Sequence, residues 1–187
     1  SDWGAGAFTG CTGLERLSVS LLPGRKSCLK EILSELRQAL RVDLCDPEGE
    51  LTARLVFPEF YEESVENTPA RIIMREVHGC GHMYRYCFDG GDFDFREYDR
   101  LFPYVQAQEP EEFVSGLALC RLCFPAGLGP EAQEEYRAYI REHPAAAARA
   151  AMAERDATMT ARLAEEARER GQLLAMIGEA ERAGNAA

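Results

Sequence analysis

The hydrophobic residues of this chain change their spacing along its length. Around residues 51–57 they alternate with other residues, with Leu51, Ala53, Leu55 and Phe57 on one side, whereas from residue 111 onward they recur every three or four positions. Alternation is typical of strands with one buried face, and the longer spacing is typical of amphipathic helices. Strands followed by helices predict an α+β fold, in which helices flank an antiparallel β-meander.

The individual elements follow from the same patterns. An amphipathic helix is expected over residues 27–40, with Ser27 as its N-cap. A possible strand precedes it, and three further strands form the meander, with a polar loop at residues 59–69 and a turn at Asp89-Gly90-Gly91-Asp92. Two helices and a long helical arm rich in Ala, Glu and Arg complete the chain. The strands are expected at residues 14–22, 51–57, 70–77 and 83–88, the helices at 111–123 and 130–143, and the arm up to about 182.

The charge of the chain restricts its partners. Its 187 residues include 32 acidic and 21 basic ones, giving a net charge of −11. Nucleic acids and anionic membranes are therefore excluded as partners on electrostatic grounds. No apolar run approaches the roughly 20 residues that span a bilayer, and no signal peptide is recognised, so a cytoplasmic protein is expected. The first helix is a local exception, because Lys26, Lys30 and Arg37 make it basic.

Seven cysteines are scattered through otherwise globular patterns. Their odd number and the sizeable apolar fraction of 46% are not typical of a small disulfide-bonded domain. We therefore expect a reducing environment in which most of the thiols are buried. The cysteines are Cys11, Cys28, Cys45, Cys80, Cys87, Cys120 and Cys123.

A zinc site is one interpretation of the reactive residues at 78–89. Cysteine and histidine are the ligands that zinc prefers. However, Cys120 and Cys123 lie in an apolar helical pattern and lack a Gly-rich knuckle, so no metal site is predicted. The candidate zinc ligands are His78, Cys80, His82, Cys87, Cys120 and Cys123.

A cysteine nucleophile is the second interpretation. Cys87 lies at the end of the strand expected at residues 83–88, just before the turn, where a macromolecular substrate could reach it. A thiolate attacks acyl groups and thioesters readily because sulfur is intrinsically nucleophilic. The competing interpretation is that Cys87 is a packed core thiol.

Several short passages of the sequence are informative because of their order along the chain. An amphipathic helix at residues 25–36 is followed by Leu-Val-Phe-Pro-Glu-Phe-Tyr at 55–61 and by Thr68-Pro69. Nine residues separate His78 from the cysteine of Tyr86-Cys87-Phe88-Asp89, and the passages at 112–125 and 128–136 follow. In this order they resemble the ubiquitin-conjugating (UBC) family over residues 27 to about 156.

The resemblance implies a UBC-like domain at residues 25–156, preceded by a segment at 1–24 and followed by a helical arm at 157–187. It implies that Cys87 carries a ubiquitin-like protein as a thioester and transfers it to an amine or to another cysteine, and that His78 shapes the surrounding loop. Lys26, Lys30 and Arg37 would bind the activating enzyme. A ligase or target protein would be a further partner, and no cofactor is needed because ATP is used upstream.

The sequence also departs from the family pattern. Gly79-Cys80 replaces the Pro-Asn that follows the family's histidine, and that asparagine is proposed to stabilise the oxyanion. The departures favour an alternative of another class, which is a catalytically inactive UBC-like or RWD-like scaffold. Such an adaptor would bind partners through its sheet edge and its helical arm.

Overall fold

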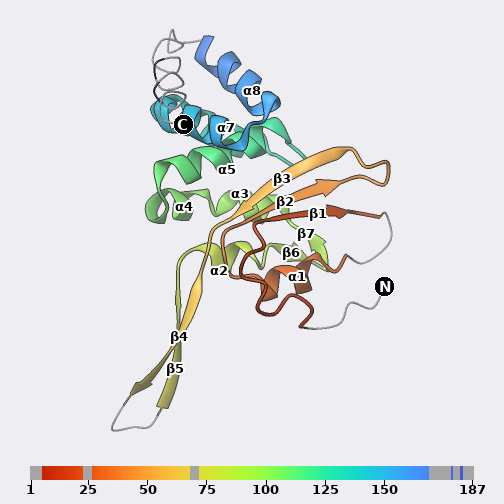
Figure 1. Ribbon diagram of the computed structural model, residues 1–187, viewed down its shortest axis with the longest axis vertical. Helices are drawn as coiled ribbons and strands as arrows, with labels where there is room; N and C mark the ends of the chain where they lie inside the picture. Colours follow the sequence, from red (N-terminus) through yellow and green to blue (C-terminus); the bar gives the residue numbers. More distant parts are fainter. Residues whose placement is uncertain (1–5, 23–26, 68–71, 169–177, 179–181, 183–187) are drawn as a thin grey trace.

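The computed structural model describes residues 6–22, 27–67, 72–168, 178 and 182 (Figure 1). It is a mixed α+β structure, as predicted, with a three-stranded sheet, a separate long hairpin, a short hairpin and a group of helices. The strands are β1 (Arg16–Ser20), β2 (Leu40–Cys45), β3 (Leu51–Phe57), β4 (Tyr61–Asn67), β5 (Ile72–His78), β6 (Phe88–Asp89) and β7 (Asp92–Phe93). The helices are α1 (Leu29–Glu35), α2 (Gly81–Tyr84), α3 (Phe95–Arg100), α4 (Phe102–Gln108), α5 (Glu111–Cys123), α6 (Pro130–Glu142), α7 (Pro144–Glu154) and α8 (Ala157–Arg168).

The three-stranded sheet has the order β1-β2-β3 and mixed strand directions. β1 runs parallel to β2, and β2 runs antiparallel to β3. Parallel neighbours need a crossover connection, and here it contains α1. The predicted single antiparallel meander is therefore wrong, because β1 joins in parallel and the later strands form separate two-stranded sheets.

The two faces of β2 and β3 differ in chemistry. Leu40, Val42 and Leu44 pair with Phe57, Leu55 and Ala53 in a buried apolar layer. The opposite face sets Arg41 and Asp43 beside Val56 and Arg54. Helix α1 adds Leu29, Ile32 and Leu33 to the core, whereas α5 packs against β3 and against α6, α7 and α8.

A buried ion pair joins three of the helices. The Arg121 guanidinium of α5 donates from Nε and Nη2 to the Asp99 carboxylate of α3, at 2.8 and 3.0 Å. The Tyr136 hydroxyl of α6 donates to the same carboxylate at 2.7 Å. All three side chains are buried, so this polar link lies inside the core.

Several local predictions are confirmed. β1 lies within residues 14–22, β5 covers most of the strand expected at 70–77, Leu51–Phe57 is β3, and the helices at 111–123 and 130–143 are α5 and α6. The Asp89-Gly90-Gly91-Asp92 turn joins β6 to β7. The first helix is shorter than expected, because α1 ends at Glu35 and Leu40 already begins β2.

Two other local predictions are wrong. Most of the polar loop expected at residues 59–69 is β4, whose backbone is paired with β5. The strand expected at 83–88 is largely helix α2 and a turn. Gly79 turns the chain out of β5 with φ +89°, and Gly81 packs so closely that an added Cβ would lie 2.1 Å from the Pro58 carbonyl oxygen. These close backbone contacts override the strand preference of the tyrosines that follow.

The flanking segments join the body of the protein where they are described. β1, from the expected N-terminal segment, is hydrogen-bonded to β2. α8, from the expected arm, buries Met159, Leu163 and Ala167 against the other helices. The rest of the arm, apart from residues 178 and 182, lies outside the described residues. In the described ranges, no helix combines the length and the apolar character needed to cross a membrane.

Candidate functional site

Cys87 lies in the hydrophobic core and not on a reachable edge. Its side chain is 1% exposed, and its Sγ donates to the Met83 carbonyl oxygen at 3.7 Å. Burial, together with the nearby carboxylates of Glu97 and Asp94, raises the pKa of the Cys87 thiol to about 12. The structure therefore holds Cys87 as a neutral, enclosed thiol, which does not favour the catalytic role that the resemblance implies.

His78 lies at the end of β5, in different surroundings. Its ring stacks on Tyr61 with centroids 4.7 Å apart, and its Nε2 lies 3.7 Å from a Glu63 oxygen and 3.9 Å from a Glu76 oxygen. The described contacts of His78 and those of Cys87 have no residue in common. The structure thus gives the predicted pair no shared reaction centre.

Cys80, which stands where the family has asparagine, is also buried. Its Sγ lies 3.9 Å from Oε1 of Glu109. Burial, together with the neighbouring Glu109 carboxylate, raises the pKa of the Cys80 thiol to about 11. A protonated, enclosed thiol at this position cannot replace the amide donor of an oxyanion hole.

The side chains considered as zinc ligands are dispersed. His82 packs edge-on against Phe60 and tilted against Tyr86, with centroids 5.3 and 4.9 Å apart. Cys120 is buried within α5. Across the described ranges, no three side chains of the His, Cys, Asp or Glu type are grouped so that they could hold a metal ion.

The basic residues of the first helix have separate positions. Lys26 lies outside the described residues, and Lys30 is exposed on α1. Arg37 follows α1, donates to Glu62 of β4 at 2.9 Å and lies over the Phe60 ring. Arg37 is therefore paired with an acidic side chain of this protein, and the role of these residues toward an activating enzyme stays a prediction.

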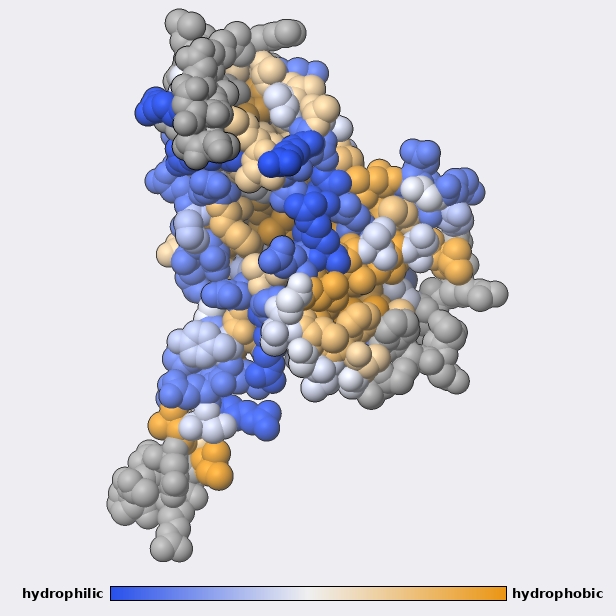
Figure 2. Space-filling model, in the orientation of Figure 1, coloured by the Kyte–Doolittle hydropathy of each residue, from blue (hydrophilic) through white to orange (hydrophobic). Residues whose placement is uncertain are grey.

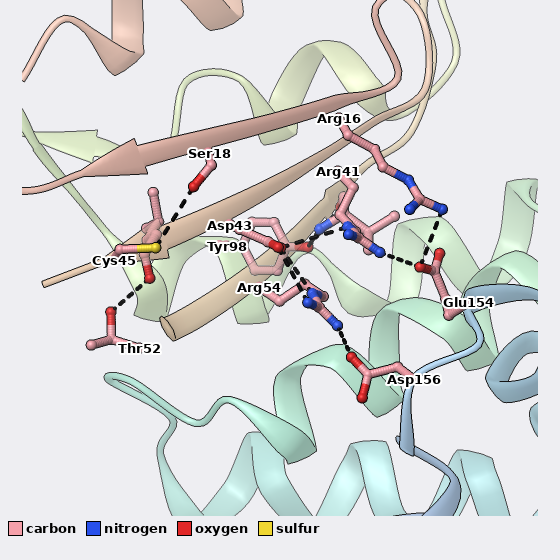
Figure 3. Close-up of polar contacts among 12 residues, drawn as sticks. Arg16, Ser18, Arg41, Asp43, Cys45, Thr52, Arg54, Tyr98, Glu154 and Asp156 are labelled. Atoms are coloured by element: carbon pink, nitrogen blue, oxygen red, sulfur yellow. Dashed lines mark hydrogen bonds and ion pairs between the residues drawn. The ribbon is translucent and has the colours of Figure 1, made fainter. Parts of the chain in front are cut away.

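A network of charges connects the sheet to the junction of α7 and α8 (Figure 3). Arg54 donates to both oxygens of Asp43 and to Asp156, and Arg41 donates to Glu154. The nearby groove of about 710 Å³ is lined by Arg16 and Arg41, but both arginines already face Glu154. Paired charges of this kind stabilise the docking of helices on the sheet, and they are not free to bind a ligand.

Asp156 should make the stability of this junction depend on pH. Burial alone would raise its pKa, but hydrogen bonds from Arg54 and from the Thr158 amide lower it below the ordinary value of 3.8. A lowered carboxyl pKa stabilises the fold above the unfolded-state value, and this stabilisation is lost as the pH falls through the folded-state value. We expect Asp156→Ala to reduce the free energy of unfolding by about 1–2 kcal/mol at neutral pH and by much less near pH 3, as measured by urea unfolding.

The control for this prediction is Glu165→Ala on α8. Glu165 pairs with Arg162 at the surface, so its loss should cost at most about 0.5 kcal/mol. A loss in Asp156→Ala that is the same at both pH values would contradict an electrostatic origin.

The hairpin of β4 and β5, hereafter the hairpin arm, projects from the body (Figure 1). It carries five of the eight large hydrophobic side chains that are exposed in the described part of the chain, and Figure 2 shows hydrophobic residues on its surface. Clustered exposed apolar side chains are typical of surfaces that bind a partner. These residues are Tyr61, Val65, Ile73, Met74 and Val77.

Arg85 anchors the hairpin arm to the body. The Arg85 side chain is 1% exposed and donates to the carbonyl oxygens of Leu36, Gln38, Pro58 and Gly81. These acceptors belong to the end of α1, to the chain before β4 and to the chain after β5. The sequence patterns predicted β5 but neither Arg85 nor β4, because arginine is usually exposed and the polar residues of β4 indicate a loop.

The chain matches no protein-family model, and neither a curated protein nor a solved structure shows significant similarity to it.

Proposed function

We propose that this chain is a non-catalytic module that binds a partner protein, and not a carrier of thioesters. The observation that carries the proposal is the enclosure of Cys87, whose thiol is 1% exposed and has a pKa of about 12. Nucleophilic catalysis needs an accessible thiolate. The exposed apolar side chains of the hairpin arm support binding as the alternative function.

The scaffold interpretation also accommodates the departures from the family pattern. Cys80 replaces the asparagine and is itself buried, so the oxyanion donor of the family has no equivalent at this position. Association with a ubiquitin-like protein or with its activating enzyme stays a prediction from the resemblance. Under this proposal such proteins would bind without forming a covalent bond to Cys87.

A pulse of alkylating reagent on the folded protein tests the proposal. Cys11 is exposed and should react first, whereas Cys87 and Cys80 are buried and should react at least about 100-fold more slowly, until denaturant is added. Peptide mapping by mass spectrometry measures each rate within the same sample, so Cys11 serves as the internal control.

The second half of this test is a charging assay, which detects a thioester between the protein and a ubiquitin-like protein. The protein is incubated with an activating enzyme, its ubiquitin-like partner and ATP, and is then analysed on a non-reducing gel. We expect no thiol-sensitive adduct. Rapid labelling of Cys87, or an adduct that disappears in Cys87→Ala, would refute the scaffold proposal.

A further inference from the structure

The hairpin arm is a two-stranded sheet whose outer edges are open in the part of the chain that the structure describes. β4 and β5 pair only with each other among the described strands, so each has one edge without a neighbour. Open edges offer rows of backbone donors and acceptors to any extended chain, and an isolated two-stranded hairpin is only marginally stable in water. An added strand would complete the sheet and cover part of its apolar surface.

One face of the hairpin arm has an ordered pattern of side chains. The register sets Tyr61 opposite His78, Glu63 opposite Glu76, and Val65 opposite Met74. Two carboxylates therefore face each other between an aromatic pair and an apolar pair. Like charges directly opposite destabilise a sheet, and a cation placed beside them would relieve this repulsion.

No arginine or lysine reaches Glu63 within the described ranges. Its one described ion-pair partner is His78, at 3.7 Å, and its own side chain is 62% exposed. Its neighbour Glu62, on the other face of β4, is already bound by Arg37. The exposed carboxylate of Glu63, which is not paired with an arginine or lysine in the described ranges, thus makes β4 the edge that suits a cationic partner.

A second copy of this chain is not expected to pair with the strands of the hairpin arm. Full antiparallel pairing of β5 with a two-fold copy of itself would set Arg75 opposite Arg75, which is unfavourable. It would also set Met74 opposite Glu76. The net charge of −11 on each copy adds long-range repulsion.

We infer that β4 binds an extended segment of a partner protein that carries a lysine or arginine between two apolar residues, each two positions away. Side chains two apart share one face of a strand, so this spacing would set the cation beside Glu63 and the apolar residues beside Tyr61 and Val65. This inference rests on the proposed protein-binding function. It specifies the edge, the charge and the spacing that the partner must have.

The test uses a blocked peptide, Ser-Val-Thr-Lys-Thr-Val-Ser, and a control peptide with Glu in place of Lys. The full-length protein is titrated with each, and binding is followed by NMR shifts and hydrogen exchange of the amides at residues 61–67. We expect the Lys peptide to bind at least about tenfold more tightly than the Glu peptide, and to slow amide exchange in β4.

Charge reversal provides the matched variants. Glu63→Lys should reverse the preference, so that the Glu peptide binds more tightly. Glu48→Lys makes the same change in net charge at an exposed turn position before β3 and should leave the preference unchanged. Both positions are exposed, so neither substitution should prevent folding.

Several outcomes would overturn the inference: failure of both peptides to bind, an unchanged preference in Glu63→Lys, an equal effect of Glu48→Lys, or a homodimer held together by the hairpin arm. Each of these outcomes leaves the alkylation and charging results intact. Labelling or charging of Cys87 would instead refute the proposed function, so the two failures can be told apart.

Discussion

Arg121→Met is expected to lower the free energy of unfolding by about 3–5 kcal/mol, because it breaks a buried ion pair. Among the described side chains, the substitution leaves the Asp99 carboxylate in the core with only the Tyr136 hydroxyl as a hydrogen-bond donor. It also removes the hydrogen bonds from Arg121 to the carbonyl oxygens of Phe124 and Ala126. Urea unfolding monitored by circular dichroism measures the loss.

The electrostatic cause of this effect can be separated from the loss of packing. Burial alone would lower the pKa of the Arg121 guanidinium, but the hydrogen bonds to Asp99 outweigh it and raise that pKa, so Arg121 is held as a cation. Arg121→Met combined with Asp99→Leu removes both charges, and should be less destabilising than the sum of the two single substitutions by about 2 kcal/mol or more. Strict additivity would contradict the coupling.

A surface variant provides the control. Arg100, on the same helix as Asp99, is 72% exposed and pairs with Glu97 at 3.1 Å. Arg100→Met should change the free energy of unfolding by less than about 1 kcal/mol. A similar loss in Arg100→Met and Arg121→Met would show that burial of the ion pair is not the cause.

The helical half of the fold was predictable because its signals are local. The spacing of apolar residues in α5 and α6 lies within each helix, and Pro130 marks the start of α6. Residues 95–108, which form α3 and α4, were not predicted to form an element. A signal was present there, because Asp94 caps α3 by accepting from the Glu97 amide, the spacing of a capping box.

The sheet topology was not predictable from local patterns. β1 and β2 are separated by a helix, and nothing in the alternation of either strand indicates that they run in parallel. The strand character of β4 depends on pairing with β5, because its polar residues alone are typical of a loop. Pairing between distant segments is a tertiary property.

The enclosure of Cys87 was likewise not predictable from local sequence patterns. Cys87 was correctly placed just before a turn, but the direction of its side chain depends on how α3 and the core pack around it. The chain turns back through β6 and β7, and the Asp94 amide donates to the Cys87 carbonyl oxygen at 2.9 Å, which holds this segment against the body. A motif can therefore have the right spacing while the structure encloses its thiol.

Arg85→Met is expected to lower the free energy of unfolding by about 3–5 kcal/mol and to loosen the hairpin arm more than the rest of the protein. The substitution removes the donors to four carbonyl oxygens, and a buried acceptor without a partner costs about 1–3 kcal/mol. Burial lowers the pKa of Arg85 to about 10, so the side chain is still protonated at neutral pH and binds these carbonyls as a cation.

Two opposing effects determine how much the free energy of unfolding falls in Arg85→Met. Removing Arg85 also removes the cost of burying a charge that has no carboxylate among its hydrogen-bond acceptors. The lost bonds should outweigh this relief, because four carbonyl oxygens lose their donor at once. Arg85→Lys keeps the charge but has fewer donors and no planar fork, so its loss should be intermediate.

Hydrogen exchange distinguishes a specific anchor from an ordinary core residue. In Arg85→Met the amides of β4 and β5 should exchange faster relative to those of β2 and β3, since the arm is held to the body at residues 58 and 81, where Arg85 binds. Arg37→Met provides the control at the same junction, because Arg37 is half-exposed and its pair with Glu62 should contribute at most about 1 kcal/mol. A uniform rise in exchange across both sheets would mean that Arg85 supports the whole core and does not specifically hold the arm that we propose as the binding surface.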